Sequence, residues 1–314
     1  MPSVVMQRLE DSCDVDLNEG ADLTEDQLIV RLRDKQGLVS VFTNQVTRRA
    51  IESAPQLRVI ANVAVGYNNI DLQAARERGI VVTNTPDVLT EATANLTWAL
   101  ILDITRRVSE GDRLVRRAGW KGWTFNFMLG SDLAGKQLGV VGMGRIGRAV
   151  ARRAQAFDMR IACFSPRASG RVSLLDDEGT EFGSAESMPL DRLLATSDVV
   201  TLHCPLTDET RHLIDQTALA RMKRSAYLIN AARGPVVDEA ALAWALKSRL
   251  IAGAALDVYE REPEVQQELL ALENVVLSPH LGSSTTETRV AMADLAALNV
   301  IAVLTGKPAV TPVP

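Results

Sequence analysis

Short apolar runs alternate with longer helical patterns along most of the chain. A run of about four to eight apolar residues bounded by turn residues is typical of a buried strand, and strands that alternate with helices are typical of a parallel sheet. We expect one group of strands at 39–43, 57–63 and 80–84, and a second at 138–142, 160–164, 199–203, 226–230, 251–257 and 275–277. The pattern therefore predicts an α/β protein with two parallel sheets.

Two helical runs connect these groups. The run at 91–110 leaves the first group, and the apolar run at 285–304 returns to it. A chain of 314 residues is also longer than one hydrophobic core usually supports. We therefore expect two doubly wound parallel-sheet domains. A flavodoxin-like domain at 1–93 and 283–314 would contain an inserted domain at 94–282, whose six strands match the Rossmann count.

Composition narrows the class of protein. Hydrophobic residues make up 46% of the chain and charged residues 23%, and the net charge of −5 leaves no basic stripe for a nucleic acid. No apolar run has the length that a membrane span needs. The three cysteines, Cys13, Cys163 and Cys204, have no metal-binding or redox spacing, so we expect no metal and a reducing, cytoplasmic location.

A dinucleotide-binding loop is predicted where the first strand of the second group ends. Gly142, Gly144 and Gly147 have the spacing G-x-G-x-x-G, with Arg145 and Ile146 inside the loop. The first glycine permits a tight turn, the second lets the backbone approach a pyrophosphate, and the third lets helix and strand pack closely. A glycine triplet alone is a weak signal, but its position between a strand and a helix favours nucleotide binding.

The end of the next strand predicts which dinucleotide binds. NAD is usually held there by an acidic residue that accepts a hydrogen bond from the ribose 2′-hydroxyl. Here the sequence reads Ser165, Pro166 and Arg167, and no acidic side chain follows until Asp176. A hydroxyl and a guanidinium suit a 2′-phosphate, so we expect NADP(H) to be preferred. The alternative is that Arg167 only solvates a loop and that NAD(H) is also used.

Three further residues have the chemistry needed to reduce a 2-oxo acid. Arg233 can bind a carboxylate with two parallel hydrogen bonds, and the imidazole of His280 can supply a proton as charge develops on the carbonyl oxygen. Glu262 can orient the imidazole and favour its protonated form. Each also has a plainer interpretation: an arginine at a turn, a glutamate in a solvated loop and a structural histidine. Their order behind a dinucleotide loop favours catalysis.

Longer motifs point to a known family. They are 64–71 (AVGYNNID), 83–94 (TNTPDVLTEATA), 120–123 (WKGW), 202–207 (LHCPLT), 229–234 (INAARG), 255–263 (ALDVYEREP) and 278–283 (SPHLGS). With these motifs the chain resembles the D-isomer-specific 2-hydroxyacid dehydrogenases, and among them the glyoxylate and hydroxypyruvate reductases. The resemblance covers nearly the whole chain.

The resemblance implies roles for individual residues. It makes Arg233, Glu262 and His280 the catalytic residues, and it assigns the substrate carboxylate to Arg233 and the backbone amides of Val65 and Gly66. The cofactor contacts that it implies are Thr93, Gly142, Gly144, Arg145, Ile146, Gly147, Ser165, Arg167, Pro205, Ala231, Asp257 and Gly282.

Three of these contacts are assigned to a part of the cofactor. Thr93 and Asp257 match positions at the nicotinamide half, and Pro205 matches a loop that flanks the adenosine. From the residues alone, Thr93 reads as a helix residue and Asp257 as a strand end.

Two segments carry further expectations. Similar enzymes usually open with an apolar strand, whereas residues 1–9 already have a helical pattern. We therefore expect the first strand to be missing, through a misplaced start or as a true variant. The segment 118–129 holds two of the four tryptophans and two of the six phenylalanines and resembles a dimerisation arm. We expect a homodimer; packing of this segment on its own chain is the alternative.

The expected activity is NADPH-dependent reduction of a small 2-oxo acid, glyoxylate or hydroxypyruvate, with His280 as the general acid. Two alternatives stay open. A phosphoglycerate dehydrogenase would favour NAD, and the turn at Ser165 argues against it. A nucleotide-sensing binding protein of the same fold, like the corepressors that keep the three residues, would bind the cofactor without turnover.

Overall fold

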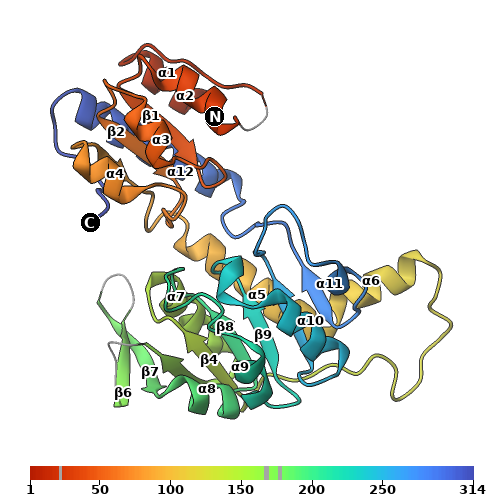
Figure 1. Ribbon diagram of the computed structural model, residues 1–314. Coiled ribbons are helices and arrows are strands. Elements are labelled where there is room, and N and C mark those ends of the chain that lie inside the picture. The colour runs from red at the N-terminus through yellow and green to blue at the C-terminus, as the bar shows by residue number, and fades with distance from the viewer. Residues whose placement is uncertain (21–22, 166–169, 176–178) are drawn as a thin grey trace. The chain divides into compact units, whose positions relative to one another are not determined.

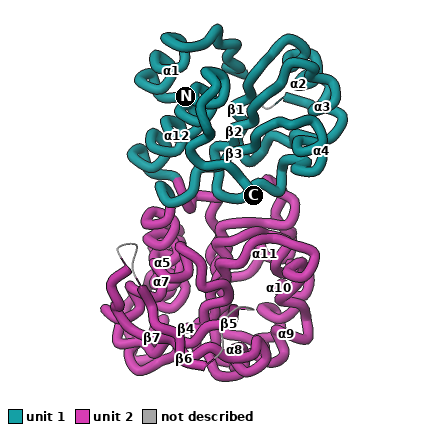
Figure 2. The backbone as a smooth tube through the Cα atoms, turned by 90° about the vertical axis from the view of Figure 1, so that its left-hand side faces the viewer, with its two compact units in different colours: residues 1–89, 284–314 teal, residues 90–283 magenta. Residues whose placement is uncertain are grey.

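The computed structural model describes residues 1–20, 23–165, 170–175 and 179–314. The chain forms two compact units (Figure 2). Unit 1 consists of Met1–Leu89 and Ser284–Pro314, and unit 2 of Thr90–Ser283. The expected boundaries were 93/94 and 282/283, so the first observed boundary lies four residues earlier and the second one residue later.

Unit 1 is built on a three-stranded parallel sheet. Its strands pair in chain order: β1 (Gly37–Val41), β2 (Val59–Val63) and β3 (Val81–Thr83). Three helices pack with Ile60 and Val82 on one face: α2 (Glu25–Leu32), α3 (Arg48–Glu52) and α4 (Leu72–Glu77). On the other face lie α12 (Thr286–Leu304) and, packed against it, α1 (Ser3–Glu10). Figure 1 shows α3 in front of the sheet and α12 behind it, which explains why every residue of β2 is buried.

Unit 2 is built on an eight-stranded sheet in the order β11-β10-β9-β8-β4-β5-β7-β6. Its strands are β4 (Gln137–Val141), β5 (Arg160–Phe164), β6 (Gly170–Leu175), β7 (Glu181–Ser187), β8 (Val199–Leu202), β9 (Tyr227–Asn230), β10 (Gly253–Leu256) and β11 (Val275–Leu277). All pair in parallel except β6, which is antiparallel to β7. The chain order of the strands reverses at β4, as in a Rossmann domain, and this arrangement confirms the predicted α/β class.

Helices cover both faces of this sheet. Helices α5 (Thr90–Arg106) and α7 (Arg145–Ala154) pack on the face that carries Val140 and Ile229. Three helices pack on the opposite face, which carries Val141 and Leu228: α8 (Leu190–Thr196), α9 (Gln216–Arg221) and α10 (Glu239–Lys247). Successive residues of β4 enter different cores because side chains alternate along a strand. None of the described helices, the 19-residue α12 included, is long and apolar enough to cross a membrane.

Two expectations about unit 2 are wrong. The sequence pattern does not predict β6 and β7, because these two strands at one end of the sheet bury few side chains, Leu174 and Ala185 among them. The single helix expected at 91–110 is two helices, α5 and α6 (Val108–Arg116). Arg107 between them has a left-handed backbone with φ 58°, and the Asp103 carboxylate accepts a hydrogen bond from Ser109 N at 2.7 Å, which starts the second helix separately.

Candidate active site

The glycine loop between β4 and α7 leaves open space at the helix N-terminus. Gly142 has φ +94°, and a Cβ there would lie 2.6 Å from Cys204 N. A Cβ at Gly147 would lie 2.2 Å from the Gly142 carbonyl oxygen. Gly144, the N-cap of α7, has no atom within 4 Å of its Cβ position. Two glycines are therefore required by the fold of the loop, and the third leaves room for a ligand at the helix N-terminus.

The loop after β8 lies against this glycine loop. His203 Nε2 is 2.9 Å from Thr201 Oγ1, and the buried Nδ1 has no hydrogen-bond partner among the described residues. Burial lowers the pKa of His203 to about 3 and raises the pKa of the Cys204 thiol to about 11. Both side chains are therefore neutral near pH 7, and they do not form a thiolate–imidazolium pair. Pro205 follows at the surface, where its carbonyl oxygen accepts a hydrogen bond from Thr210 Oγ1 at 2.6 Å.

Ser165 directly follows β5, at the same edge of the sheet. Gly142 N donates a hydrogen bond to the Phe164 carbonyl oxygen at 3.0 Å, so the glycine loop and the end of β5 lie side by side. Arg167, on which the expected NADP preference also rests, lies outside the described residues.

Thr93 and Asp257, expected near the nicotinamide, and Gly282, expected to contact the cofactor, come together. Asp257 directly follows β10 and is 1% exposed. Its carboxylate accepts hydrogen bonds from Ser278 Oγ at 2.6 Å, Leu281 N at 2.7 Å and Gly282 N at 2.8 Å. A Cβ at Gly282 would lie 3.5 Å from Thr93 Cγ2. Burial raises the pKa of Asp257, although these hydrogen bonds oppose the rise.

His280 and Glu262 form a hydrogen-bonded pair. His280 Nδ1 is 2.8 Å from Glu262 Oε2, and their side chains are 24% and 28% exposed. Tyr259 N donates to the other carboxylate oxygen at 3.0 Å. Burial would raise the pKa of Glu262, but the hydrogen bond and charge of His280 hold it below its usual value. His280 has φ +53°, and its backbone N–H donates to the Asp257 carbonyl oxygen. Such a backbone is uncommon for a residue other than glycine and marks a constrained position.

Arg233 lies on the turn after β9, next to the loop of Glu262. A Cβ at Gly234 would lie 1.9 Å from the backbone carbon of Tyr259, so only glycine allows the two loops to approach so closely. Arg233 Nη1 donates to the Ala232 carbonyl oxygen at 2.7 Å. Burial lowers the pKa of Arg233, and the charge of Glu262 opposes this shift. The three residues expected to be catalytic thus belong to neighbouring loops of unit 2.

Two residues that support these loops were not expected. Asn230, the last residue of β9, donates from Nδ2 to the Arg233 carbonyl oxygen at 3.0 Å and accepts from Ala232 N at 3.1 Å. It thereby holds the turn that contains the half-buried Ala231. Ser278 binds Asp257 through its hydroxyl, as described above. An asparagine that ends an otherwise apolar strand was a usable signal for the first, whereas nothing in the sequence marks the second.

Val65 and Gly66 lie in unit 1, two and three residues after the end of β2. Both are partly exposed. They follow the fully buried strand on a loop, as expected for backbone amides that bind a ligand.

The match to known proteins is extensive. A model of the "D-isomer specific 2-hydroxyacid dehydrogenase, NAD binding domain" matches residues 98–282, more than half of the chain. The chain belongs to the D-isomer-specific 2-hydroxyacid dehydrogenase family. It is 45% identical to the glyoxylate reductase of Pyrococcus horikoshii over 98% of this chain and 91% of that protein. It is 47% identical, with the same coverage, to the glyoxylate reductase of Korarchaeum cryptofilum.

Solved structures of the family agree with this match. An NADPH-dependent glyoxylate/hydroxypyruvate reductase of Sinorhizobium meliloti, in complex with NADP and malonate, is 35% identical, with a TM-score of 0.85 and coverage of 98% of this chain and 92% of that chain. A protein of Thermus thermophilus is 42% identical, with a TM-score of 0.91 and coverage of 100% and 97%. The chain is therefore an NAD(P)-dependent oxidoreductase.

The residues of unit 2 fit the dinucleotide that this dehydrogenase family uses. The open position at Gly144 accepts a pyrophosphate at the N-terminus of α7, where Arg145 is exposed and Ile146 half-buried. The unpartnered Nδ1 of His203 and the buried carboxylate of Asp257 offer polar contacts at the same carboxyl edge of the sheet. The site thus has the cradle and the polar groups that a nicotinamide dinucleotide needs.

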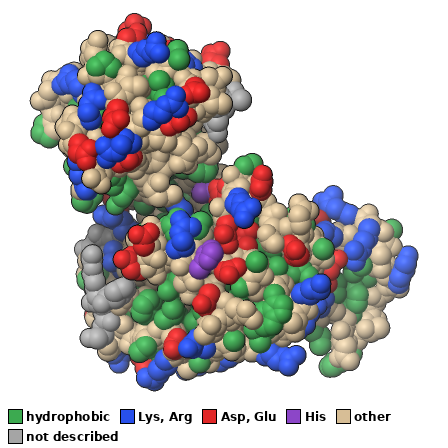
Figure 3. Space-filling model, in the orientation of Figure 1, with side chains coloured by type: hydrophobic (Ala, Val, Ile, Leu, Met, Phe, Trp, Pro, Cys, Tyr) green, Lys and Arg blue, Asp and Glu red, His purple; other side chains and the backbone are tan. Residues whose placement is uncertain are grey.

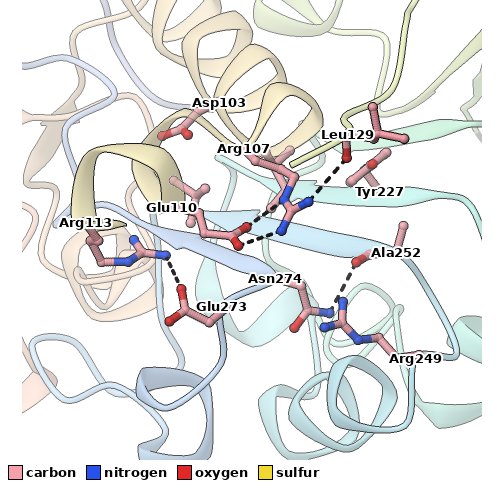
Figure 4. Close-up of a pocket in the computed structure, with 12 residues that line it drawn as sticks. Asp103, Arg107, Glu110, Arg113, Leu129, Tyr227, Arg249, Ala252, Glu273 and Asn274 are labelled. Atoms are coloured by element: carbon pink, nitrogen blue, oxygen red, sulfur yellow. Dashed lines mark hydrogen bonds and ion pairs between the residues drawn. The ribbon is translucent and has the colours of Figure 1, made fainter. Parts of the chain in front are cut away.

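A pocket of about 400 Å³ lies at the opposite edge of the same sheet (Figure 4). It is lined by Tyr227, the first residue of β9, and by Ala252 and Asn274, just before β10 and β11. Arg107 and Glu110 form a two-bonded ion pair in it, at 2.8 and 2.6 Å. Because dinucleotides bind at the carboxyl ends of the strands, this pocket is not part of the candidate active site.

The variant Gly144→Ala distinguishes an effect on cofactor binding from an effect on folding of the loop. A methyl group there meets no atom within 4 Å, and φ of −77° suits alanine, so we expect the unliganded protein to keep its melting temperature. The same methyl group would occupy pyrophosphate space, so the Kd for NADPH, measured by nicotinamide fluorescence, should rise about tenfold or more.

Gly147→Ala is the matched comparison. Its Cβ would clash with the Gly142 carbonyl oxygen, so we expect this variant to lose stability without any ligand. Equal Kd values for Gly144→Ala and the unchanged protein would show that the dinucleotide does not approach this loop.

Proposed function

We propose that this dehydrogenase reduces a small 2-oxo acid, glyoxylate or hydroxypyruvate, with NADPH as the preferred cofactor. The observation that carries the proposal is the His280–Glu262 pair, 2.8 Å apart, beside the Arg233 turn. A proton donor, a carboxylate that stabilises its charged form and a cation for the substrate's own carboxylate are the groups that this reduction needs. The similar glyoxylate reductases support the substrate class.

Each residue has a proposed task. The bound nicotinamide supplies a hydride to the carbonyl carbon. His280 donates a proton to the carbonyl oxygen as negative charge develops there, and Glu262 orients the imidazole and stabilises its protonated form. Arg233 binds the substrate carboxylate, a task that we also assign to the amides of Val65 and Gly66.

The cofactor preference rests on the end of β5. A hydroxyl at Ser165 and a guanidinium at Arg167 favour the 2′-phosphate of NADP, and in the sequence no acidic residue follows them until Asp176. The Sinorhizobium meliloti relative, which is NADPH-dependent, supports this preference. Some activity with NADH is compatible with the proposal.

The test is the initial rate of NADPH oxidation with glyoxylate and with hydroxypyruvate, repeated with NADH. We expect turnover with NADPH and a higher kcat/KM than with NADH. His280→Gln should lower kcat about 10²- to 10⁴-fold, the range for a positioned general acid, while NADPH still binds. His212→Gln is the control, because His212 pairs only with Glu260 at the surface. Tight cofactor binding without turnover would instead indicate a nucleotide-sensing protein.

Glu262→Gln tests the pairing of Glu262 with His280 through the pH dependence of the reduction. The rate requires a protonated imidazole, so kcat/KM falls as the pH rises and the proton is lost. The charge of the imidazole and its hydrogen bond hold the pKa of Glu262 down, so the carboxylate in turn favours the protonated imidazole; without that charge the falling limb should move to lower pH. Glu264→Gln, an exposed change in the same loop, should leave the limb in place. If the falling limb does not move in Glu262→Gln, Glu262 does not stabilise the protonated form of His280.

We also propose that the enzyme is a homodimer. Helix α6 buries none of its residues, and the loop after it exposes 57% of Trp120, 75% of Trp123 and 82% of Phe125. Figure 3 shows hydrophobic side chains beside basic ones on the right-hand side, where α6 and this loop lie. Large exposed aromatic side chains in one segment are typical of a subunit contact.

Light scattering tests this contact. We expect a particle of twice the chain mass, and a shift to the monomer mass when Trp123→Ser is combined with Phe125→Ser, because the contact loses its aromatic anchors. Trp244→Ser, which changes a 48% exposed tryptophan on α10, should leave the mass unchanged. A monomer mass for the unchanged enzyme at micromolar concentration would rule out the dimer.

A further inference from the structure

Polar side chains are buried beneath the loop that follows β2 in unit 1. Asn62, within β2, is fully buried, Asn69 is 5% exposed and Ser40 of β1 is 1% exposed. Asn62 Oδ1 accepts hydrogen bonds from Ser40 Oγ at 3.1 Å and Asn69 Nδ2 at 3.3 Å. These contacts fix the orientation of the Asn62 amide, so that its Nδ2 faces the loop.

Three successive carbonyl groups of the loop accept hydrogen bonds from other residues of unit 1. The Ala64 carbonyl oxygen accepts from Thr85 N at 2.9 Å. The Val65 carbonyl oxygen accepts from Asn84 Nδ2 at 2.8 Å, and the Gly66 carbonyl oxygen from Asn62 Nδ2 at 2.9 Å. Residues 64–66 of the loop are therefore held through their carbonyl groups.

The peptide geometry then fixes where the amides lie. None of these peptide bonds is cis. In a trans peptide the N–H points away from the carbonyl of the same unit, so anchoring one group directs the other to the opposite side. The N–H groups of Val65, Gly66 and Tyr67 thus each point away from the donor that binds the carbonyl oxygen of the same peptide unit. None of them has an acceptor among the described residues, and all three residues are partly exposed.

An array of successive backbone amides without acceptors suits an anion. We propose that Asn62 and Asn84 are positioning residues that orient the amides of Val65, Gly66 and Tyr67 as a binding site for the substrate's carboxylate. The inference rests on the proposed reduction of a 2-oxo acid and adds to it the Tyr67 amide and the two asparagines.

The choice of residue agrees with this role. A valine at position 62 would suit a strand buried on both faces better, because a buried polar side chain costs stability unless all its hydrogen bonds are made. Aspartate could accept hydrogen bonds but has no N–H for the Gly66 carbonyl oxygen. Asparagine supplies both an acceptor for Ser40 and a donor for the loop.

Substitutions of Asn84 disturb the fold less than substitutions of Asn62, because the backbone of Asn84 is held by other hydrogen bonds. Asn84 N donates to the Thr311 carbonyl oxygen at 3.3 Å, and the Asn84 carbonyl oxygen accepts from Thr311 Oγ1 at 2.6 Å. Asn84 is only partly buried, so water can replace its side chain at the Val65 carbonyl oxygen. We therefore expect Asn84→Ala and Asn84→Asp to fold.

The experiment compares kinetic constants for the 2-oxo acid in these variants. We expect KM to rise about ten- to hundredfold, the range for hydrogen bonds to a charged group, with a much smaller change in kcat and an unchanged Kd for NADPH. Asn84→Asp should raise KM more than Asn84→Ala, because its carboxylate repels the Val65 carbonyl oxygen and displaces the loop. Ser40→Ala is the matched control: it removes one of the two hydrogen bonds to Asn62 Oδ1, while Asn69 Nδ2 still donates to that oxygen and keeps the amide oriented. Both carbonyl anchors therefore stay in place, and KM should be unchanged.

The outcomes are distinct. Asn84 variants that are less stable or less active but keep KM unchanged would show a purely structural role and overturn the inference. If the unchanged enzyme reduces no 2-oxo acid, the proposed function fails, and binding of malonate to the NADP-loaded protein by calorimetry decides the inference instead. Weaker malonate binding in the Asn84 variants but not in Ser40→Ala would support it, and equal binding would overturn it.

Discussion

The buried carboxylate of Asp257 is the constraint on which the candidate active site depends. A carboxylate that is 1% exposed must have its oxygens bound, and here Ser278 Oγ and the amides of Leu281 and Gly282 bind them. All three donors belong to the segment that carries His280, so satisfying the charge also sets the path of that segment. The left-handed backbone of His280 agrees with this: the chain turns there and brings a hydroxyl before the histidine and two amides after it toward one carboxylate.

The parallel sheet of unit 2 determines which residues can cooperate. Gly142, His203, Asn230 and Asp257 each follow or end a strand, and in a parallel sheet all such positions lie at the same edge. The glycine loop and the turn of Arg233 therefore lie at one edge, although about ninety residues separate them along the chain. Close packing then decides the details. Gly234 lets the Arg233 turn contact the loop of Glu262, and the charge of Glu262 in turn opposes the effect of burial on Arg233.

The sequence predicted the parts of the structure that are governed by repeated local rules. Buried parallel strands are continuous apolar runs, so most strands and the glycine loop were found, and the order of Arg233, Glu262 and His280 indicated a site that the structure brings to neighbouring loops. Strands β6 and β7, at one end of the sheet, carry little apolar signal and were missed. The break at Arg107 depends on a hydrogen bond from Ser109 to Asp103, which no periodicity encodes. The role of Ser278 depends on the distant Asp257, and so could not be predicted from its neighbours.

Both units use the same physical device to shape the loops that follow buried strands. In unit 2, Asn230 ends β9 and holds the Arg233 turn through a donor and an acceptor of one side chain. In unit 1, Asn62 and Asn84 hold two successive carbonyl groups of the loop after β2. An apolar side chain at any of these positions could not form these hydrogen bonds, so the conformation of the following loop would be less restricted. A polar side chain in an apolar strand costs stability and restricts the backbone beyond it, and that restriction is useful only where the backbone itself must meet a ligand. In this chain, the asparagines at or near strand ends therefore fix the backbone of the two loops to which we assign the substrate carboxylate.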